Sequence, residues 1–232
     1  MLRYALTRVV GAIPTMFLVV LVAFMMVRAA PGGPFDTDRM LPAEVAANIE
    51  RAYHLDEPLP QQFRRYLTGV LRGDFGPSFR YSDYSVAELV SGALPVSVRL
   101  GVIAILLALC VGISAGLVAA LRRNTMTDRI VSAIAMTGVS VPVIVIAPLL
   151  VLFFAVHLGW LPAGWSSSHG ASRWIMPVIA LALPQIAFIA RITRSSMIEV
   201  LESDYIRTAR AQGLATATIV RYHAMKPALL PL

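Results

Sequence analysis

The charged side chains whose spacing suggests a role lie near the C-terminal end of the chain, in the run Asp-Tyr-Ile-Arg-Thr-Ala-Arg-Ala-Gln-Gly-Leu at residues 204–214. Arg207 and Arg210 stand three residues apart, so a helix would present both guanidinium groups on one face. This pattern supports charged contact with another surface. The simpler alternative is an exposed loop in which Asp204 pairs with Arg207 and gains roughly a few tenths of a kcal/mol.

Residue types at both ends of this run predict a helix that is followed by a sharp turn. Ser203 or Asp204 can cap the free amide groups of its first turn, and Gln212 closes it. Gly213 suits a left-handed conformation, which costs other residues roughly 1–2 kcal/mol. A second short helix should then leave at an angle and carry on one side Ile219, Val220 and Tyr222.

Reactive side chains elsewhere have no spacing that suggests catalysis, a cofactor or a metal site. Lys226 is the only lysine and follows Met225, so the chain has no Gly-Lys-Ser/Thr phosphate-binding loop. Cys110 is the only cysteine. The scattered histidines are His54, His157, His169 and His223. We therefore expect no enzyme activity, and any ATP hydrolysis must come from another chain.

The composition is that of a membrane protein. Hydrophobic residues make up 57% of the chain and charged residues only 14%, whereas soluble domains have about 25% charged residues. The mean hydropathy is +0.71. The formal net charge of +7 could suggest a nucleic-acid partner, but the basic residues are distributed as membrane topology would require, so we expect none.

Four apolar segments are long enough to cross a hydrocarbon core, which needs about 20 residues. They lie at 9–27 and at about 95–121, 130–157 and 174–190. A cleavable signal peptide is the alternative for the first segment, but its apolar run is too long and Arg28 stands where a small residue is required. The predicted divisions are 1–30 with the first span, an extracytoplasmic domain at 31–93, and a core transmembrane domain at 94–232 that ends in a loop at 199–232.

The basic residues gather on one predicted side of the membrane, as the positive-inside rule requires. With the N-terminus in the cytoplasm, 31–93 and 158–173 lie outside. The first of these holds six arginines against nine acidic residues, whereas the inner segments 122–129 and 191–232 carry net positive charge. The residues expected at the outer interface are Trp160, Trp165 and Trp174.

Segment 31–93 is too polar to span a membrane, and its residue pattern predicts short helices. Two of them should begin near Pro42 and Pro60, and Ser85 with Glu88 forms a capping box that opens a third. Such short helices need a surface to pack on. We therefore expect a compact helical domain over the outer mouth of the transmembrane domain.

Small residues and prolines shape the predicted core spans. A small-residue stripe that allows close helix packing comprises Ala104, Ala108, Gly112, Gly116 and Ala120. Prolines that should kink the next two spans are Pro142, Pro148, Pro177 and Pro184. Gln185 is the most polar side chain deep in a span, where it lines a substrate path or bonds to a neighbouring helix.

The run at 204–214, followed by His-Ala-Met-Lys-Pro-Ala-Leu-Leu-Pro at 223–231, resembles the cytoplasmic coupling loop of the dipeptide/oligopeptide permeases, the membrane subunits of ABC importers. The resemblance covers the whole chain in order and includes Gly-Asp-Phe-Gly-Pro-Ser at 73–78 and Leu-Pro-Val-Ser-Val at 94–98. Gly213 matches the family's turn glycine. The Glu-Ala-Ala that names the loop across importers reads Arg-Thr-Ala at 207–209, a variant that is similar to the peptide permeases.

The resemblance implies an all-α, polytopic type I ABC-importer transmembrane domain with a helical extracytoplasmic insertion after its first span. It also implies that the loop inserts into a cleft of the ATPase subunit and transmits its motion. The residues expected to take part are Tyr205, Arg207, Thr208, Ala209, Arg210, Gly213 and Leu214. Among them, we expect Arg207 and Arg210 to make the charged contacts.

The resemblance further implies a bacterial cytoplasmic membrane, a second related permease, two ATPase subunits that hold ATP and Mg, and an extracytoplasmic peptide-binding protein. The substrates would be di- or oligopeptides. The family continues with about two more spans after the position of Leu232, so we expect a truncated sequence that does not transport alone.

Two alternatives stay open at this point. One is a permease of the same importer class for another solute, such as nickel or haem. The other is a membrane anchor or sensor whose basic tail binds anionic lipid. Association with an ATP-binding chain would favour transport, whereas salt-sensitive lipid binding by the tail alone would favour the anchor.

Overall fold

The computed structural model describes residues 2–29, 57–78, 81, 84–165 and 167–232. The chain divides into two compact units, Met1–Leu94 and Pro95–Leu232. Across the described residues the regular elements are helices, and the only extended pairing is an isolated bridge between Pro77 and Ser85. The predicted all-α class is confirmed. The helix that we expect near Pro42 lies outside the described residues.

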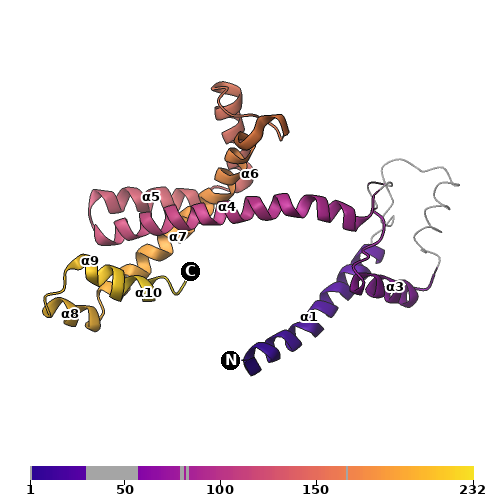
Figure 1. Cartoon of the computed structure of the whole chain (residues 1–232), viewed down its shortest axis with the longest axis horizontal. Coiled ribbons are helices and arrows are strands. Elements are labelled where there is room, and N and C mark those ends of the chain that lie inside the picture. Colours follow the sequence, from indigo (N-terminus) through magenta and orange to yellow (C-terminus); the bar gives the residue numbers. More distant parts are fainter. Residues whose placement is uncertain (1, 30–56, 79–80, 82–83, 166) are drawn as a thin grey trace. The chain divides into compact units, whose positions relative to one another are not determined.

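In the first unit, α1 (Leu2–Ala29) and α3 (Leu59–Leu71) lie next to each other (Figure 1). Aromatic side chains join them. The ring of Phe63 on α3 lies 5.8 Å from that of Phe17 and 5.2 Å from that of Phe24, with both pairs edge to face. Such pairs add about 0.5–1.5 kcal/mol beyond the burial of their area. Pro60 stands in the first turn of α3, as predicted.

The capping box predicted at the start of the next helix, α4 (Val86–Leu121), is present. The Ser85 N–H donates to Oε2 of Glu88 at 2.8 Å, and the Glu88 N–H donates to Oγ of Ser85 at 3.2 Å. Two amide groups at the free end of the helix are thereby satisfied.

In the second unit, the small-residue stripe of α4 packs directly on α7 (Ile175–Leu201), as predicted. A Cβ added at Gly112 would stand 2.8 Å from Cγ2 of Ile189, and one added at Gly116 would stand 2.5 Å from the carbonyl oxygen of Ala190. Because glycine has no side chain, the two backbones approach at these points.

Helix α5 (Met126–Ser140) packs on the same helix α7. A Cβ at Gly138 would lie 2.8 Å from the Cβ of Ala187, so this crossing is also close. Helix α7 therefore contacts both α4 and α5, and it continues to Leu201, past the end expected near residue 190.

The third predicted span, 130–157, is broken in the structure. Helix α5 ends at Ser140, and a second helical segment, α6 (Val143–Leu150) continued by the π-helix η1 (Val151–His157), leaves at 103°. Pro142 stands at the break and holds the residue before it out of the helical region, which is why the helix stops there.

Three helices of the described residues are long and apolar enough to span a membrane, namely Arg3–Ala29, Val86–Leu121 and Gly170–Leu201. The bent pair makes a fourth if its two parts form one span. The four-span topology therefore remains a prediction.

Candidate functional site

The helix predicted in the run 204–214 is present as α8 (Asp204–Ala211), which starts directly after a turn at the end of α7. Its cytoplasmic position remains a prediction. Ser203 occupies the N-cap position with an extended backbone, at φ −68° and ψ 154°. Its hydroxyl donates a hydrogen bond of 2.6 Å to the carbonyl oxygen of Val200, so it does not cap the amide groups of α8. The start of the helix is confirmed, whereas the expected side-chain cap is absent.

The turn after α8 has the left-handed geometry expected at Gly213, where φ is +80°. The Leu214 N–H donates to the Ala209 carbonyl at 3.2 Å, and the Gly213 N–H donates to the Arg210 carbonyl at 2.9 Å. These two bonds form the paired closure typical of a glycine-terminated helix. The direction of the chain after α8 is thus fixed by hydrogen bonds.

The second arm consists of α9 (Thr216–Thr218), the π-helix η3 (Ile219–Ala224) and α10 (Met225–Ala228). Ile219 and Val220 are buried, but Tyr222 is 67% exposed. The expectation that Tyr222 shares their side is therefore wrong. Residues three apart lie on one face of an α-helix. A π-helix has more residues per turn, so Tyr222, three residues after Ile219, does not return to the buried face.

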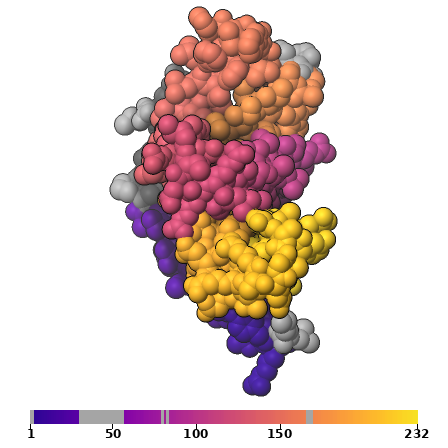
Figure 2. Space-filling view, turned by 90° about the vertical axis from the view of Figure 1, so that its left-hand side faces the viewer, coloured from indigo at the N-terminus to yellow at the C-terminus, as the bar shows by residue number. Residues whose placement is uncertain are grey.

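Both arms pack on the ends of the membrane helices through one apolar cluster. The cluster joins α4, α7, α8 and the second arm and comprises Ala120, Met197, Ile206, Ala209, Ile219, Ala224 and Ala228. Met197 and Ile206 are fully buried. Residues 204–228 form a continuous mass, yellow in Figure 2, which we name the coupling lobe after the role that the resemblance predicts for it. The lobe is therefore held by packing as well as by its chain connection.

The outer face of α8 carries most of the predicted contact residues. The exposed ones are Tyr205, Arg207, Thr208, Arg210, Gly213 and Leu214. Ala209 instead lies in the apolar cluster, three residues after Ile206 and therefore on the same inward face. It can support the helix but cannot itself reach a partner.

The charges on this face are solvated. Nη1 of Arg207 lies 3.3 Å from Oδ1 of Asp204, with the two side chains 72% and 94% exposed. Surface pairs of this kind contribute about 0–1 kcal/mol, so the contact does not prevent Arg207 from meeting another surface. Arg210 has no ion-pair partner among the described residues.

Behind the lobe, two ion pairs join the segment 122–129 to α7. The guanidinium of Arg194 holds the carboxylate of Asp128 with two parallel bonds of 2.5 and 2.8 Å. Arg123 pairs with Glu202 at the end of α7. In the sequence these side chains contribute only to the charge of the inner segments, because nothing local relates Asp128 to Arg194, 66 positions away, or Arg123 to Glu202, 79 positions away.

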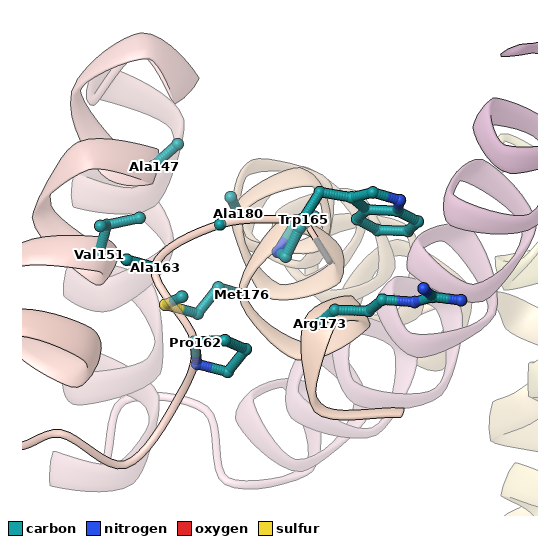
Figure 3. A pocket seen from close by; sticks show the side chains of 10 residues that line it. Ala147, Val151, Pro162, Ala163, Trp165, Arg173, Met176 and Ala180 are labelled. Atoms are coloured by element: carbon teal, nitrogen blue, oxygen red, sulfur yellow. The ribbon is translucent and has the colours of Figure 1, made fainter. Parts of the chain in front are cut away.

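A pocket of ≈ 210 Å³ lies at the other end of the second unit, between α6, η1, the loop 162–165 and the start of α7 (Figure 3). The Arg173 guanidinium stacks 4.9 Å from the ring of Trp165, which also contacts Trp174. Gln185 is not among the lining residues. It lies on the exposed side of α7 and has no hydrogen-bond partner among the described residues, so its role in a substrate path remains a prediction.

The site offers recognition chemistry. Within the described residues, no three acidic, histidine or cysteine side chains gather where they could hold a metal ion. The face of α8 presents guanidinium, hydroxyl and phenol groups on a helix whose position is fixed from behind. Such a surface can bind a groove in another protein and pass displacement to α7 and α4.

Two family models match this chain along most of its length. Residues 112–232 match the family described as binding-protein-dependent transport system inner membrane component, and residues 1–101 match the corresponding N-terminal membrane component. The chain belongs to this permease family. It is accordingly a helical, multi-pass protein of a bacterial inner membrane.

Curated relatives narrow the family to the dipeptide/oligopeptide permeases. The oligopeptide transport system permease protein OppB of Salmonella typhimurium is 53% identical over 231 residues, which cover 100% of this chain and 76% of the relative. The protein of the same name from Escherichia coli K12 has the same values. The dipeptide transport system permease protein DppB of Bacillus subtilis is 40% identical over 232 residues, with 100% and 74% covered. The predicted resemblance is confirmed.

Proposed function

We propose that this chain is a permease subunit of an ATP-driven importer that forms part of the path for di- or oligopeptides across the cytoplasmic membrane. ATP hydrolysis takes place on separate ATPase subunits, and α8 is the element that binds them. The names of the relatives, which are oligopeptide and dipeptide permeases, support the substrate class. The face of α8 supports the coupling role.

The observation that carries the coupling role is the two-sided character of α8. Ile206 and Ala209 face the apolar cluster shared with α4 and α7, while Arg207 and Arg210 face solvent. A force applied to the outer face would therefore reach two membrane helices through close-packed side chains, which resist compression. A flexible loop could not do this.

The proposed assembly contains a second related permease, two ATPase subunits and an extracytoplasmic peptide-binding protein, all within or against a lipid bilayer. ATP and Mg belong to the ATPases. The N-terminus and the coupling lobe lie in the cytoplasm, in line with the arginines of 122–129 and of the lobe. Closure of the ATPases draws the coupling helices together and biases the permease pair between inward-open and outward-open states.

Charge reversal on α8 tests the proposal. The full-length chain with Arg207→Glu and Arg210→Glu is co-expressed with the second permease and the ATPases. It should still insert into the membrane, but the amount of ATPase that co-purifies with it should fall by on the order of tenfold or more. The reason is that each reversed charge would meet a surface complementary to the original charge. Arg122→Glu is the matched control, since this exposed arginine lies outside the coupling lobe. ATPase recovery equal to that of the unmodified chain would refute the docking role of α8.

Uptake measurements test the substrate class separately. Proteoliposomes with the complete importer and its binding protein should accumulate a labelled tri- or tetrapeptide on addition of ATP. Accumulation of nickel or haem in place of peptide would show that the chain is a permease of the same importer class for another solute. Salt-sensitive binding of the lobe to anionic vesicles without ATPase association would support a lipid anchor.

A further inference from the structure

The first turn of α5 is tied to α7 by a carboxylate whose acceptor positions are filled. Oδ1 of Asp128 accepts from Nε of Arg194 at 2.5 Å and from Oγ of Ser132 at 3.3 Å. Oδ2 accepts from Nη2 of Arg194 at 2.8 Å and from the Asn124 N–H at 3.0 Å. The Asp128 side chain is 4% exposed, so solvent screens this contact only slightly.

We propose that Asp128 and Arg194 are positioning residues for transport: they make α5 follow the movement of the coupling lobe. The proposal rests on the proposed function, because it needs an ATPase that moves α8. The role proposed for the pair is that of a link between helices.

The need for such a link follows from the packing of the lobe. The apolar cluster behind α8 takes its membrane-helix residues from α4 and α7 and none from α5. Helix α5 also packs on α7 where Gly138 meets Ala187, towards its other end. Such apolar packing resists compression, but it is non-directional and restrains sliding along the interface less than a directed bond does. A bidentate guanidinium–carboxylate pair fixes both separation and orientation. At the end of α5 nearest the lobe, Asp128 and Arg194 supply that constraint.

The position of α5 makes the constraint useful. Beyond Ser140 the chain bends by 103° into α6 and η1, which line the pocket shown in Figure 3 with Ala147 and Val151. Movement of α7 that is passed to α5 therefore reaches the wall of this pocket. Without the ion pair, only apolar packing would hold the first turn of α5 to α7, so less of the movement of α7 would reach α5 and the pocket wall.

The second pair provides a comparison within the same loop. Arg123 and Glu202 also connect the 122–129 segment to α7, but their side chains are 48% and 63% exposed. Exposed pairs are weak and screened by salt. We expect Glu202 to be dispensable where Asp128 is not.

The experiment measures peptide transported per ATP hydrolysed in proteoliposomes that contain the full-length chain, its second permease, the ATPases and the binding protein. Asp128→Asn and Arg194→Gln should each lower this ratio by on the order of tenfold, with ATPase association unchanged. The double variant should be no worse than either single variant, because the two residues act through one contact. Glu202→Gln should stay within about twofold of the unmodified chain.

Three results would overturn the inference. An unchanged ratio in Asp128→Asn would do so, as would a double variant whose loss is the product of the two single losses. Loss of ATPase association or of membrane insertion in Asp128→Asn would show that the pair serves folding and not coupling. If the unmodified complex binds no ATPase, both the proposed function and the inference are refuted. If coupling is normal in the unmodified complex and also in Asp128→Asn, only the inference is refuted.

Discussion

Replacement of Gly213 gives the sharpest test of the turn after α8. Its φ of +80° lies in the left-handed region, and an added Cβ would meet no atom within 4 Å. The cost of Gly213→Ala is therefore conformational and not steric, at roughly 1–2 kcal/mol. If the turn relaxes, the bonds from Gly213 to Arg210 and from Leu214 to Ala209 are lost, and the second arm leaves α8 in another direction.

The expected size of the effect follows from that cost. A penalty of 1–2 kcal/mol changes a two-state population by about 5- to 30-fold. ATPase activity that depends on the permease should therefore fall by up to this factor in Gly213→Ala and further in Gly213→Val, because β-branched residues are disfavoured in the left-handed region. Gly213→Asn should stay closer to the unmodified chain, since asparagine tolerates this conformation.

The assay is binding-protein-stimulated ATP turnover by the reconstituted importer, with membrane insertion checked by protease protection. Gly73→Ala is a matched control, since Gly73 has a φ of +78° and open space around it but lies outside the coupling lobe. It should carry the same local cost and leave coupling intact. Full stimulation in Gly213→Val, or an equal loss in Gly73→Ala, would refute the reasoning.

Two further predictions concern the packing behind the lobe. Gly116→Ala should reduce the yield and thermal stability of the full-length chain, because its Cβ would stand 2.5 Å from the Ala190 carbonyl. Gly101→Ala is the control, since a Cβ there meets open space and should leave both quantities unchanged. Equal stability of the two variants would contradict the close approach of α4 and α7. Ile206→Ala should lower the free energy that holds the lobe on the membrane helices by about 2–5 kcal/mol, since this side chain is fully buried. Limited proteolysis within 203–228 should then become faster, and unchanged cleavage rates would contradict the burial of Ile206.

Local chemistry in the sequence predicted the end of α8 and the start of α4, although it did not predict the end of α7 at Leu201. Glycine after a polar helix predicted the turn at Gly213, and Ser85 with Glu88 predicted the start of α4. The small-residue stripe also predicted a packing face correctly, because only close approach of another backbone requires such residues at Gly112 and Gly116. These signals are encoded by residues that stand close together in the chain.

Features that depend on distant segments were not predicted. The pairing of Asp128 with Arg194 requires α5 and α7 to lie side by side, and no local pattern states this. The exposure of Tyr222 depends on a π-helical turn, which has no clear sequence signal. Pro142 indicated a break, but the 103° angle depends on what the segment after it packs against.

The contact of α4 with α7 has a mechanical consequence. Where Gly112 and Gly116 meet Ile189 and Ala190, α4 contributes no side chain to the contact, so its backbone lies directly against α7. Rotamer changes absorb small displacements in ordinary helix pairs, but at these two positions α4 has no side chain that could change its rotamer. The two helices should therefore move as one rigid body. A tilt imposed on α7 at the end next to the lobe should be followed by α4 along the whole contact.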